Sequence, residues 1–193
     1  MTLGLEHIRQ FFASYRRTEI HNPALTRAGV LVLLFMKDAE LHFLLTKRTE
    51  DVEHHKGQVS FPGGVMDDDD GNIVETALRE CREEIGLPAD AIQVLGSFDD
   101  YETPSGFAMT PVVAYVPTLP ELRPNEQEVA DLLEVPVSLF LDKANERIEQ
   151  RKRYGKIFDV YFYKYREHDV WGATAAIIRS FLGTLRDAQL GSE

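Results

Sequence analysis

Residues 73–86 join an apolar helix face to three closely spaced glutamates, and this combination restricts how the chain can fold. On a helical wheel that advances about 100° per residue, Glu80, Glu83 and Glu84 fall into one stripe. Gly86 then provides a typical helix stop. The apolar positions, which we expect to face the core, are Val74, Leu78, Cys81 and Ile85. The stretch therefore predicts a helix with a buried side and a separate side of carboxylate oxygens.

Crowded carboxylates on a helix repel one another by roughly 0.2–0.5 kcal/mol per pair, so something must offset their charge. One interpretation is a solvated acidic face, which is how most charge runs behave. The preceding F-P-G-G turn at 61–64, called the glycine turn below, favours a second interpretation, in which a metal ion lies beside the stripe. Glycines there let backbone carbonyls approach the glutamate stripe and add further oxygen ligands. Such oxygens are hard ligands that suit Mg²⁺ or Mn²⁺. We therefore predict a divalent metal site, whose expected ligands are Glu80, Glu83, Glu84 and the carbonyl of Gly64.

The acidic run at 67–70 looks like part of a calcium-binding EF-hand loop but fails that pattern at both ends. An EF-hand needs an acid about five residues before its glycine and a glutamate about six residues after it. Met66 and Ala77 occupy those two positions around Gly71. We therefore exclude a calcium loop. We expect the run to be an exposed loop, or to offset the charge of the metal from a distance.

The chain has 193 residues, and we expect them to form a single domain over 1–193. Its formal net charge of −11 argues against nucleic acid as a partner, whereas a small phosphorylated ligand is compatible because a metal can mask both charges. Cys81 is the only cysteine, which excludes an internal disulfide and fits the cytoplasm. We expect no signal peptide and no membrane span, since the apolar run at 28–36 is too short. A monomer and a homodimer both remain open.

Hydrophobic periodicity and turn residues predict the order of elements along the chain. Helices and strands are mixed without strict alternation, which favours an α/β fold with a mixed central sheet between helices. The expected helices are about 3–17, 73–86, 125–141 with a break at Pro136, and 171–185. The expected strands are 28–36, 41–46, 91–99, 107–117 and a hairpin over 148–165 around Gly155, with a loop over 50–72.

Gly64 together with R-E-C-R-E-E-I-G-L at 79–87 resembles the Nudix box, G-x5-E-x7-R-E-U-x-E-E-x-G-U. The second half of that pattern matches fully. The first half departs, because Asp70 stands at its acidic position and eight residues rather than seven then precede Arg79. The resemblance implies a member of the Nudix hydrolase superfamily, with an α/β/α sandwich fold and its Nudix box at about 64–87.

Residues 44–64, L-L-T-K-R-T-E-D-V-E-H-H-K-G-Q-V-S-F-P-G-G, resemble the stretch before the box in the coenzyme A pyrophosphatase branch. That branch has roughly L-L-T-x-R-S-x-x-L-R-x-H-x-G-x-V-x-F-P-G-G, and most positions match in register. Glu53 is the main departure, because the branch has arginine there. Residues 103–114 and W-G-A-T-A at 171–175 also look like this branch. The resemblance therefore narrows the expected substrate to coenzyme A and its derivatives.

The resemblance implies metal-dependent hydrolysis of the diphosphate bond of coenzyme A, which gives 3′,5′-ADP and 4′-phosphopantetheine. Glu80 and Glu84 would hold the metal, and Glu83 would be a shared ligand or the carboxylate that orients water. A carbonyl of the glycine turn would complete the metal shell. Arg79 would orient the glutamates by hydrogen bonding.

Five further residues are expected to meet the substrate: Arg48, His55, Lys56, Ser105 and Gly106. The three basic residues precede the glycine turn, where they would meet phosphates. Ser105 and Gly106 would shape a channel for the pantetheine arm. Surface charges are the alternative for Arg48 and Lys56, and a structural hydrogen bond is the alternative for His55.

The general base and the substrate both have alternatives. We prefer Glu83 as the base, with Glu126 or Glu128 from a loop as the other candidates. A second candidate function is hydrolysis of another diphosphate, such as ADP-ribose or a dinucleotide. A third is a non-catalytic ligand sensor with the same fold, but a pure binder has no reason to tolerate three mutually repelling glutamates.

Overall fold

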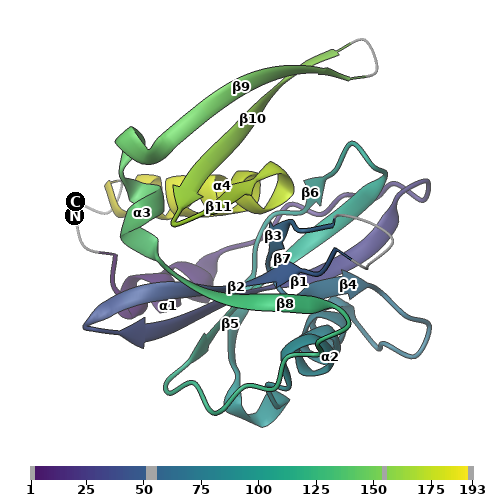
Figure 1. Ribbon diagram of the computed structural model, residues 1–193, viewed down its shortest axis with the longest axis vertical. Coiled ribbons are helices and arrows are strands. Elements are labelled where there is room, and N and C mark those ends of the chain that lie inside the picture. Colours follow the sequence, from purple (N-terminus) through teal and green to yellow (C-terminus); the bar gives the residue numbers. More distant parts are fainter. Residues whose placement is uncertain (1–2, 51–55, 154–155, 191–193) are drawn as a thin grey trace.

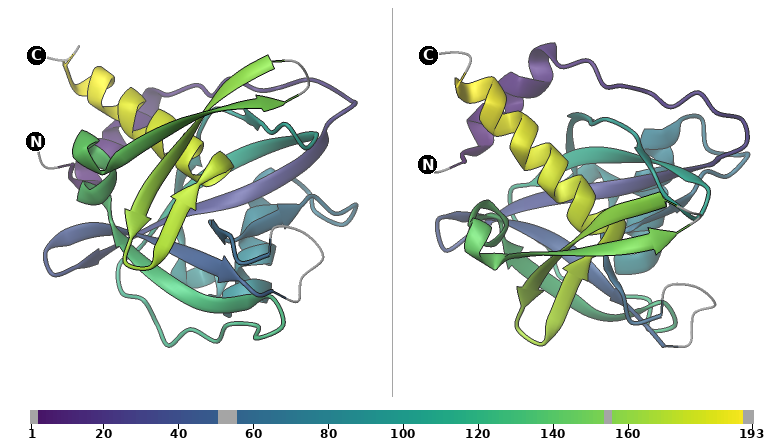
Figure 2. Two further views of the ribbon diagram at one scale, coloured as in Figure 1. Left: turned by 45° about the horizontal axis from the view of Figure 1, so that its top comes forward. Right: turned by 90° about the horizontal axis from the view of Figure 1, so that it is seen from above.

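A computed structural model of the chain describes residues 3–50, 56–153 and 156–190 (Figure 1). A large mixed sheet lies at its centre, with helix α2 (Ile73–Ile85) packed on one face. Helices α1 (Leu5–Ser14) and α4 (Gly172–Leu190) lie on the other face, together with a small three-stranded sheet (Figure 2). The predicted α/β/α sandwich with a mixed central sheet is therefore confirmed.

Over the described residues, the central sheet has eight strands, and its main path runs in the order β3-β2-β1-β7-β5. In addition, β4 pairs with β1, β6 with β7 and β8 with β2. β1 and β7 run parallel, whereas the other pairings among the described strands of this sheet are antiparallel. The strands are β1 Thr26–Lys37, β2 Glu40–Arg48, β3 Val59–Ser60, β4 Gly63–Val65, β5 Gln93–Ser97, β6 Tyr101–Glu102, β7 Phe107–Val116 and β8 Val129–Pro136.

Strand β1 lies in the middle of the sheet and is buried on both faces, because successive side chains point to opposite sides. Val30, Val32 and Leu34 belong to the core beneath α1 and α4. Leu31 and Leu33 belong to a second core, which α2 covers. The long apolar run in the sequence is therefore a strand shared by two cores.

A second, antiparallel sheet has the strand order β11-β10-β9 and packs against α4. Its strands are β9 Glu146–Arg153, β10 Lys156–Tyr165 and β11 His168–Trp171. β9 and β10 form the predicted hairpin, although its turn at Gly155 lies outside the described residues. The remaining short helices are η1 Ala89–Ala91, α3 Val137–Leu141 and η2 Lys143–Asn145. Over the described ranges, no helix is both long and apolar enough to span a membrane.

The predicted helix from residue 125 to Pro136 is wrong, because Val129–Pro136 forms strand β8. Alanine, leucine and glutamate in this stretch favour a helix when considered locally. The neighbouring strand β2 pairs with it instead, and this pairing buries Leu133 and Val135 on one face. The predicted break at Pro136 is correct, and a short helix, α3, follows it.

Three smaller boundaries also differ from the sequence-based expectation. The predicted loop over 50–72 contains strands β3 and β4, which pair with β2 and β1. The first helix is shorter than the expected 3–17, and the last helix extends beyond 185 to Leu190. Tertiary pairing and helix packing decide these ends, since the local sequence carries only weak stop signals there.

The packing of α2 against β1 depends on Gly29. A Cβ atom at this position would lie 2.7 Å from the carbonyl oxygen of Ile73 and 3.2 Å from the nitrogen of Ala77. We expect Gly29→Ala to lower the free energy of unfolding by about 1–3 kcal/mol, because the two obstructing atoms belong to backbone. Urea denaturation followed by circular dichroism would measure the change.

Gly183→Ala is the matched control, since Gly183 lies inside α4 and a Cβ atom there would meet nothing within 4 Å. We expect this variant to gain about 0.5–1 kcal/mol, because alanine favours the helix over glycine. Equal stability of Gly29→Ala and the wild type would contradict the close packing of α2 on β1.

Candidate active site

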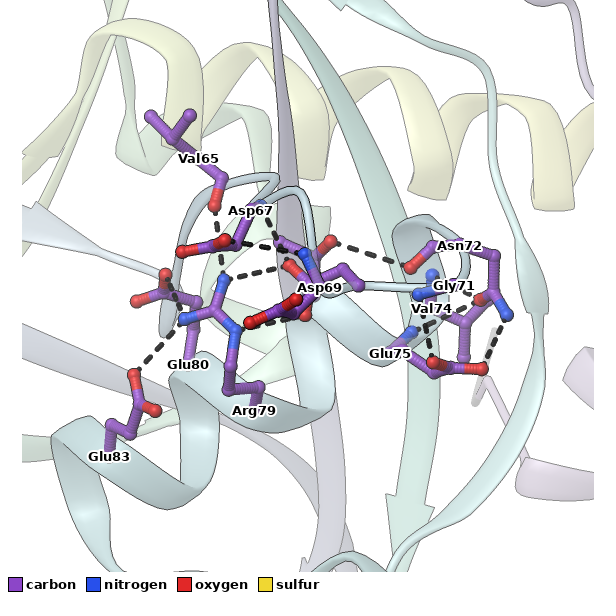
Figure 3. Close-up of polar contacts among 12 residues, drawn as sticks. Val65, Asp67, Asp69, Gly71, Asn72, Val74, Glu75, Arg79, Glu80 and Glu83 are labelled. Carbon is purple, nitrogen blue, oxygen red and sulfur yellow. Dashed lines mark hydrogen bonds and ion pairs between the residues drawn. The ribbon is translucent and has the colours of Figure 1, made fainter.

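Helix α2 begins and ends on residues that match the prediction, and Figure 3 shows the contacts at its beginning. The Asn72 side chain caps the first turn by accepting hydrogen bonds from the N–H groups of Val74 at 3.0 Å and Glu75 at 3.1 Å. The Glu75 carboxylate in turn accepts from the N–H of Gly71 at 3.0 Å. Gly86 ends the helix in the left-handed conformation, with φ of 71°. These contacts determine where the helix begins and ends.

The three glutamates of α2 differ in burial. The side chain of Glu83 is 50 % exposed, that of Glu80 is 18 % exposed and that of Glu84 is 4 % exposed. Cys81 and Ile85 are fully buried on the apolar side of the helix, and Glu84 is turned towards the interior beside them. The predicted stripe therefore runs from solvent at Glu83 to the interior at Glu84.

Strand β4 passes close to these carboxylates because two of its residues are glycines. A Cβ atom on Gly64 would lie 2.5 Å from both Cδ and Oε1 of Glu80. Gly63 has φ of 155°, a conformation that residues with a Cβ atom rarely adopt. The glycine turn thus brings backbone against the acids, as the sequence indicates.

Arg79 uses all five of its N–H donors to hold this part of the site together (Figure 3). Its Nε and Nη2 atoms donate to the two oxygens of Asp70, both at 2.9 Å. Nη1 donates to Glu80 Oε1 at 2.7 Å and to Glu83 Oε2 at 3.1 Å. Nη2 also donates to the carbonyl of Val65 at 3.1 Å. Arg79 therefore orients Glu80 and Glu83 relative to β4.

Asp70 is not part of an exposed acidic loop, contrary to the sequence-based expectation. Its side chain is 6 % exposed, whereas Asp67, Asp68 and Asp69 are exposed. The Arg79 guanidinium beside it, helped by the Asp67 N–H, holds the pKa of Asp70 well below its usual range. Asp70 is thus the anchor of Arg79, because their bidentate pairing outweighs the preference of an acid for water.

Glu84 is a buried carboxylate with few partners for its charge. Its ion-pair partner is Arg48, whose Nη1 lies 3.6 Å from Oε1. Within the described part of the chain, neither Glu84 Oε2 nor Arg48 Nε has a hydrogen-bond partner, although both atoms are buried. The pKa of Glu84 is raised to about 8, mainly because the side chain is buried. The charge of Arg48 and the N–H of Gly63 lower this pKa. The charges of Glu80 and Glu128 raise it.

The donor set at this site fits a hard divalent cation. Among the described residues, no three His, Cys, Asp or Glu side chains already form a metal cage, and Arg79 forms ion pairs with both Glu80 and Glu83. Glu84 nevertheless presents a buried oxygen without a partner, and a cation would satisfy it. The available donors are all carboxylate or carbonyl oxygens, which suits Mg²⁺ or Mn²⁺ better than softer metals.

Glu128 is a fourth glutamate next to this site, and it comes from the loop before β8. Burial raises the pKa of Glu80 and of Glu84, and the charge of Glu128 raises both further. Asn125 Nδ2 donates to Glu128 Oε1 at 3.1 Å, and the Asn125 N–H donates to the carbonyl of Glu84 at 2.8 Å. The sequence offered Glu126 equally, but that residue is exposed.

A cavity of about 610 Å³ opens beside the glycine turn, between the central sheet, α4 and the three-stranded sheet. Its walls are mainly apolar and aromatic side chains. Gly63 and Gly64 line it, and so do Arg48 and Ser105, two of the residues expected to meet the substrate. The cavity and the acidic stripe therefore share the glycine turn as a common border.

Two of the remaining expected substrate residues, Lys56 and Gly106, do not line the cavity. Lys56 is exposed and is not among the residues that line the cavity. Gly106 adopts φ of 90° in the turn between β6 and β7 and is also absent from the lining. His55 lies outside the described residues.

The NUDIX domain family matches residues 25–155, which include the glycine turn, α2 and Glu128. Two similar relatives, from Photorhabdus laumondii and Yersinia enterocolitica, are both called uncharacterized Nudix hydrolase NudL. They are 42 % and 41 % identical over 78 % and 79 % of this chain, and over 80 % and 77 % of their own lengths. The chain belongs to the Nudix family. The predicted enzyme class, a Nudix pyrophosphohydrolase, is thereby confirmed, although the names of these relatives give no substrate.

Solved structures share the Nudix fold at lower identity. A MutT/nudix family protein from Enterococcus faecalis is 16 % identical with a TM-score of 0.54, covering 96 % of this chain and 70 % of that one. DR0079 from Deinococcus radiodurans is 16 % identical with a TM-score of 0.53, covering 83 % of this chain and 87 % of that one. At this identity the likeness concerns the fold alone.

Glu84→Gln should stabilise the metal-free protein, because it removes a buried charge. With a chelator at about pH 9, we expect the variant to exceed the wild type in free energy of unfolding by about 1–3 kcal/mol. The folded-state pKa of about 8 lies above the ordinary value of 4.5, so wild-type stability falls as pH rises between them. The difference should therefore vanish near pH 4, as urea denaturation across this range would show.

Glu83→Gln is the control for that comparison, since its side chain is half exposed and should give no comparable gain. Added Mg²⁺ should raise the melting temperature of the wild type and leave that of Glu84→Gln unchanged. A Glu84→Gln protein that is less stable than the wild type at pH 9 without metal would contradict the assignment of an uncompensated charge.

Proposed function

We propose that this Nudix protein hydrolyses the diphosphate bond of coenzyme A and its derivatives, releasing 3′,5′-ADP and 4′-phosphopantetheine. The observation that carries this proposal is the shared border between the uncompensated Glu84 carboxylate and the cavity at Gly63 and Gly64. A diphosphate at this border would have its charged centre beside the acids and one organic arm in the cavity. The choice of coenzyme A rests on the in-register resemblance of residues 44–64.

Nudix hydrolases generally use divalent metals such as Mg²⁺ or Mn²⁺. In this chain we assign the metal to Glu80, Glu83, Glu84 and the carbonyl of Gly64. When bound, such a cation neutralises charge that develops on phosphate oxygens and makes water more acidic. The uncompensated oxygen of Glu84 supports this assignment, because it is the one acid of the set that the fold keeps away from water.

Three side chains have distinct roles in this proposal. Arg79 is a positioning residue that holds Glu80 and Glu83 through its fork of hydrogen bonds. Arg48 lies between Glu84 and the cavity, where its guanidinium would donate to a phosphate oxygen. Glu128 would accept the proton of the attacking water on Oε2, because Asn125 holds Oε1. We now favour Glu128 over Glu83 as the base, since Arg79 engages Glu83.

The rival substrates are other diphosphates, such as ADP-ribose or a dinucleotide. They share the charged centre with coenzyme A, so the acidic stripe alone does not separate them. The stretch at 44–64 favours coenzyme A, while Glu53 within it departs from the branch pattern. A cytoplasmic location is part of the same proposal, and a single, fully buried cysteine, Cys81, is in keeping with it.

Product analysis tests the substrate. The purified protein with Mg²⁺ is incubated separately with coenzyme A, ADP-ribose and NADH, and the products are resolved by chromatography. We expect 3′,5′-ADP from coenzyme A at a rate about tenfold or more above hydrolysis of the other two, since contacts outside the diphosphate distinguish them. A preference for ADP-ribose or NADH would replace the proposed substrate, and no turnover of any of them would leave the ligand-sensor alternative.

Glu128→Gln tests the proposed base, with Glu126→Gln as its matched control. Both variants remove one carboxylate from the same loop, but only Glu128 is linked to Glu84, through the two hydrogen bonds of Asn125. We expect kcat to fall about 100-fold or more for Glu128→Gln and to stay near the wild-type value for Glu126→Gln. Equal activity of the two variants would contradict Glu128 as the general base and would favour Glu83 instead.

A further inference from the structure

Among the described residues, two cations line the cavity, and they come from different parts of the fold. Arg48 belongs to β2 and lies beside Glu84, whereas Arg151 belongs to β9 of the three-stranded sheet. Asp159 is the one acid among the described lining residues, and Gln150 Nε2 donates to its Oδ1 at 3.4 Å. The charges of the described lining residues therefore sum to +1, in a chain whose formal net charge is −11. A positive sum over these residues, in an otherwise acidic protein, favours an anionic ligand in the cavity.

Aromatic rings hold the guanidinium of Arg151 in place. It lies 5.1 Å from the ring centroid of Phe162 and 5.3 Å from that of Trp171. The two rings are themselves stacked, with centroids 5.7 Å apart. Stacking on aromatic faces restrains an arginine without using its N–H donors. Arg151 is therefore positioned before any ligand arrives.

The counterion of Arg151 is shared with another arginine. Arg151 Nη2 donates to Glu149 Oε2 at 3.0 Å, and Arg147 Nη1 donates to Glu149 Oε1. Two arginines and one carboxylate leave one positive charge in excess. Because Arg151 lines the cavity and Arg147 does not, a ligand in the cavity would meet the charge of Arg151.

We propose that Arg151 binds a phosphate of the substrate other than the diphosphate, and that it selects nucleotides with a phosphorylated ribose. This proposal rests on the proposed function, because on coenzyme A the group is the 3′-phosphate. The adenosine half then enters the cavity, where Tyr101, Tyr161 and Trp171 are aromatic lining residues. Ser105 also lines the cavity, so in this proposal it meets the adenosine half, whereas the sequence-based expectation placed it at the pantetheine arm. ADP-ribose and NADH lack the extra phosphate, so they leave the charge of Arg151 unmatched.

The test compares coenzyme A with dephospho-coenzyme A, which differs only in lacking the 3′-phosphate. We expect the wild type to favour coenzyme A by about tenfold or more in kcat/KM, because an arginine–phosphate contact is charge-assisted. In Arg151→Gln this ratio should fall close to one. Arg151→Lys, which keeps the charge but loses the planar fork, should retain an intermediate ratio.

Arg147→Gln is the matched control. Arg147 lies on the same strand, 4.2 Å from the centroid of Phe162, and shares Glu149, but it does not line the cavity. The ratio should therefore stay at its wild-type value in this variant. Equal losses in Arg147→Gln and Arg151→Gln would overturn the proposal, since they would indicate a general effect of charge. Equal turnover of both substrates by the wild type would overturn it as well, while leaving the proposed function intact.

Calorimetric binding of 3′,5′-ADP and AMP provides a measurement that needs no turnover. The wild type should bind 3′,5′-ADP about tenfold or more tightly than AMP, and Arg151→Gln should bind the two alike. If coenzyme A is not hydrolysed but this binding difference is observed, the proposed function fails and the role of Arg151 stands. If the wild type binds 3′,5′-ADP and AMP equally, the role of Arg151 is refuted whatever the substrate.

Discussion

The fork of hydrogen bonds from Arg79 is the interaction on which the rest of the site depends. Asp70, Glu80 and Glu83 all contact this one guanidinium, and without a central cation their repulsion would push the side chains apart. Arg79 satisfies this requirement with five donors, two to Asp70, one each to Glu80 and Glu83, and one to the backbone of β4. The same guanidinium therefore both offsets the repulsion between the carboxylates and connects β4 to α2.

The buried carboxylate of Glu84 lowers the stability of the fold at this site. Its side chain is almost fully buried, and Arg48 compensates its charge only in part, at 3.6 Å. An apolar residue would be more stable in this position, so the buried carboxylate is a local weakness that ligand binding can repair. The weakness is tolerated because β1 contributes to two apolar cores, and because Gly29 lets α2 pack tightly against that strand.

The three-stranded sheet turns the acidic stripe into part of a larger site. Its position relative to α4 is held by Glu146, which accepts hydrogen bonds from Tyr163 Oη at 2.8 Å and from Arg179 Nε at 2.9 Å. The start of α4 is held to β3 by a hydrogen bond from Thr174 Oγ1 to the Val59 carbonyl at 3.1 Å. The Thr174 bond is buried, the Tyr163 bond is partly buried and the Arg179 bond is exposed, and together they connect the cavity wall to the central sheet. Arg151 of β9 and the glycine turn therefore line the same cavity.

The sequence by itself determined the local parts of this protein: the helix with its acidic stripe, the glycine turn beside it and the family to which both belong. Each of these depends on spacing within a few residues, which periodicity and motifs record directly. Only the tertiary structure decided that residues 129–136 form a strand, that Glu84 is buried and Asp70 anchors an arginine, and that Glu128 and Arg151 reach the site. Those outcomes depend on contacts between residues far apart in the chain, and packing alone brings such residues together.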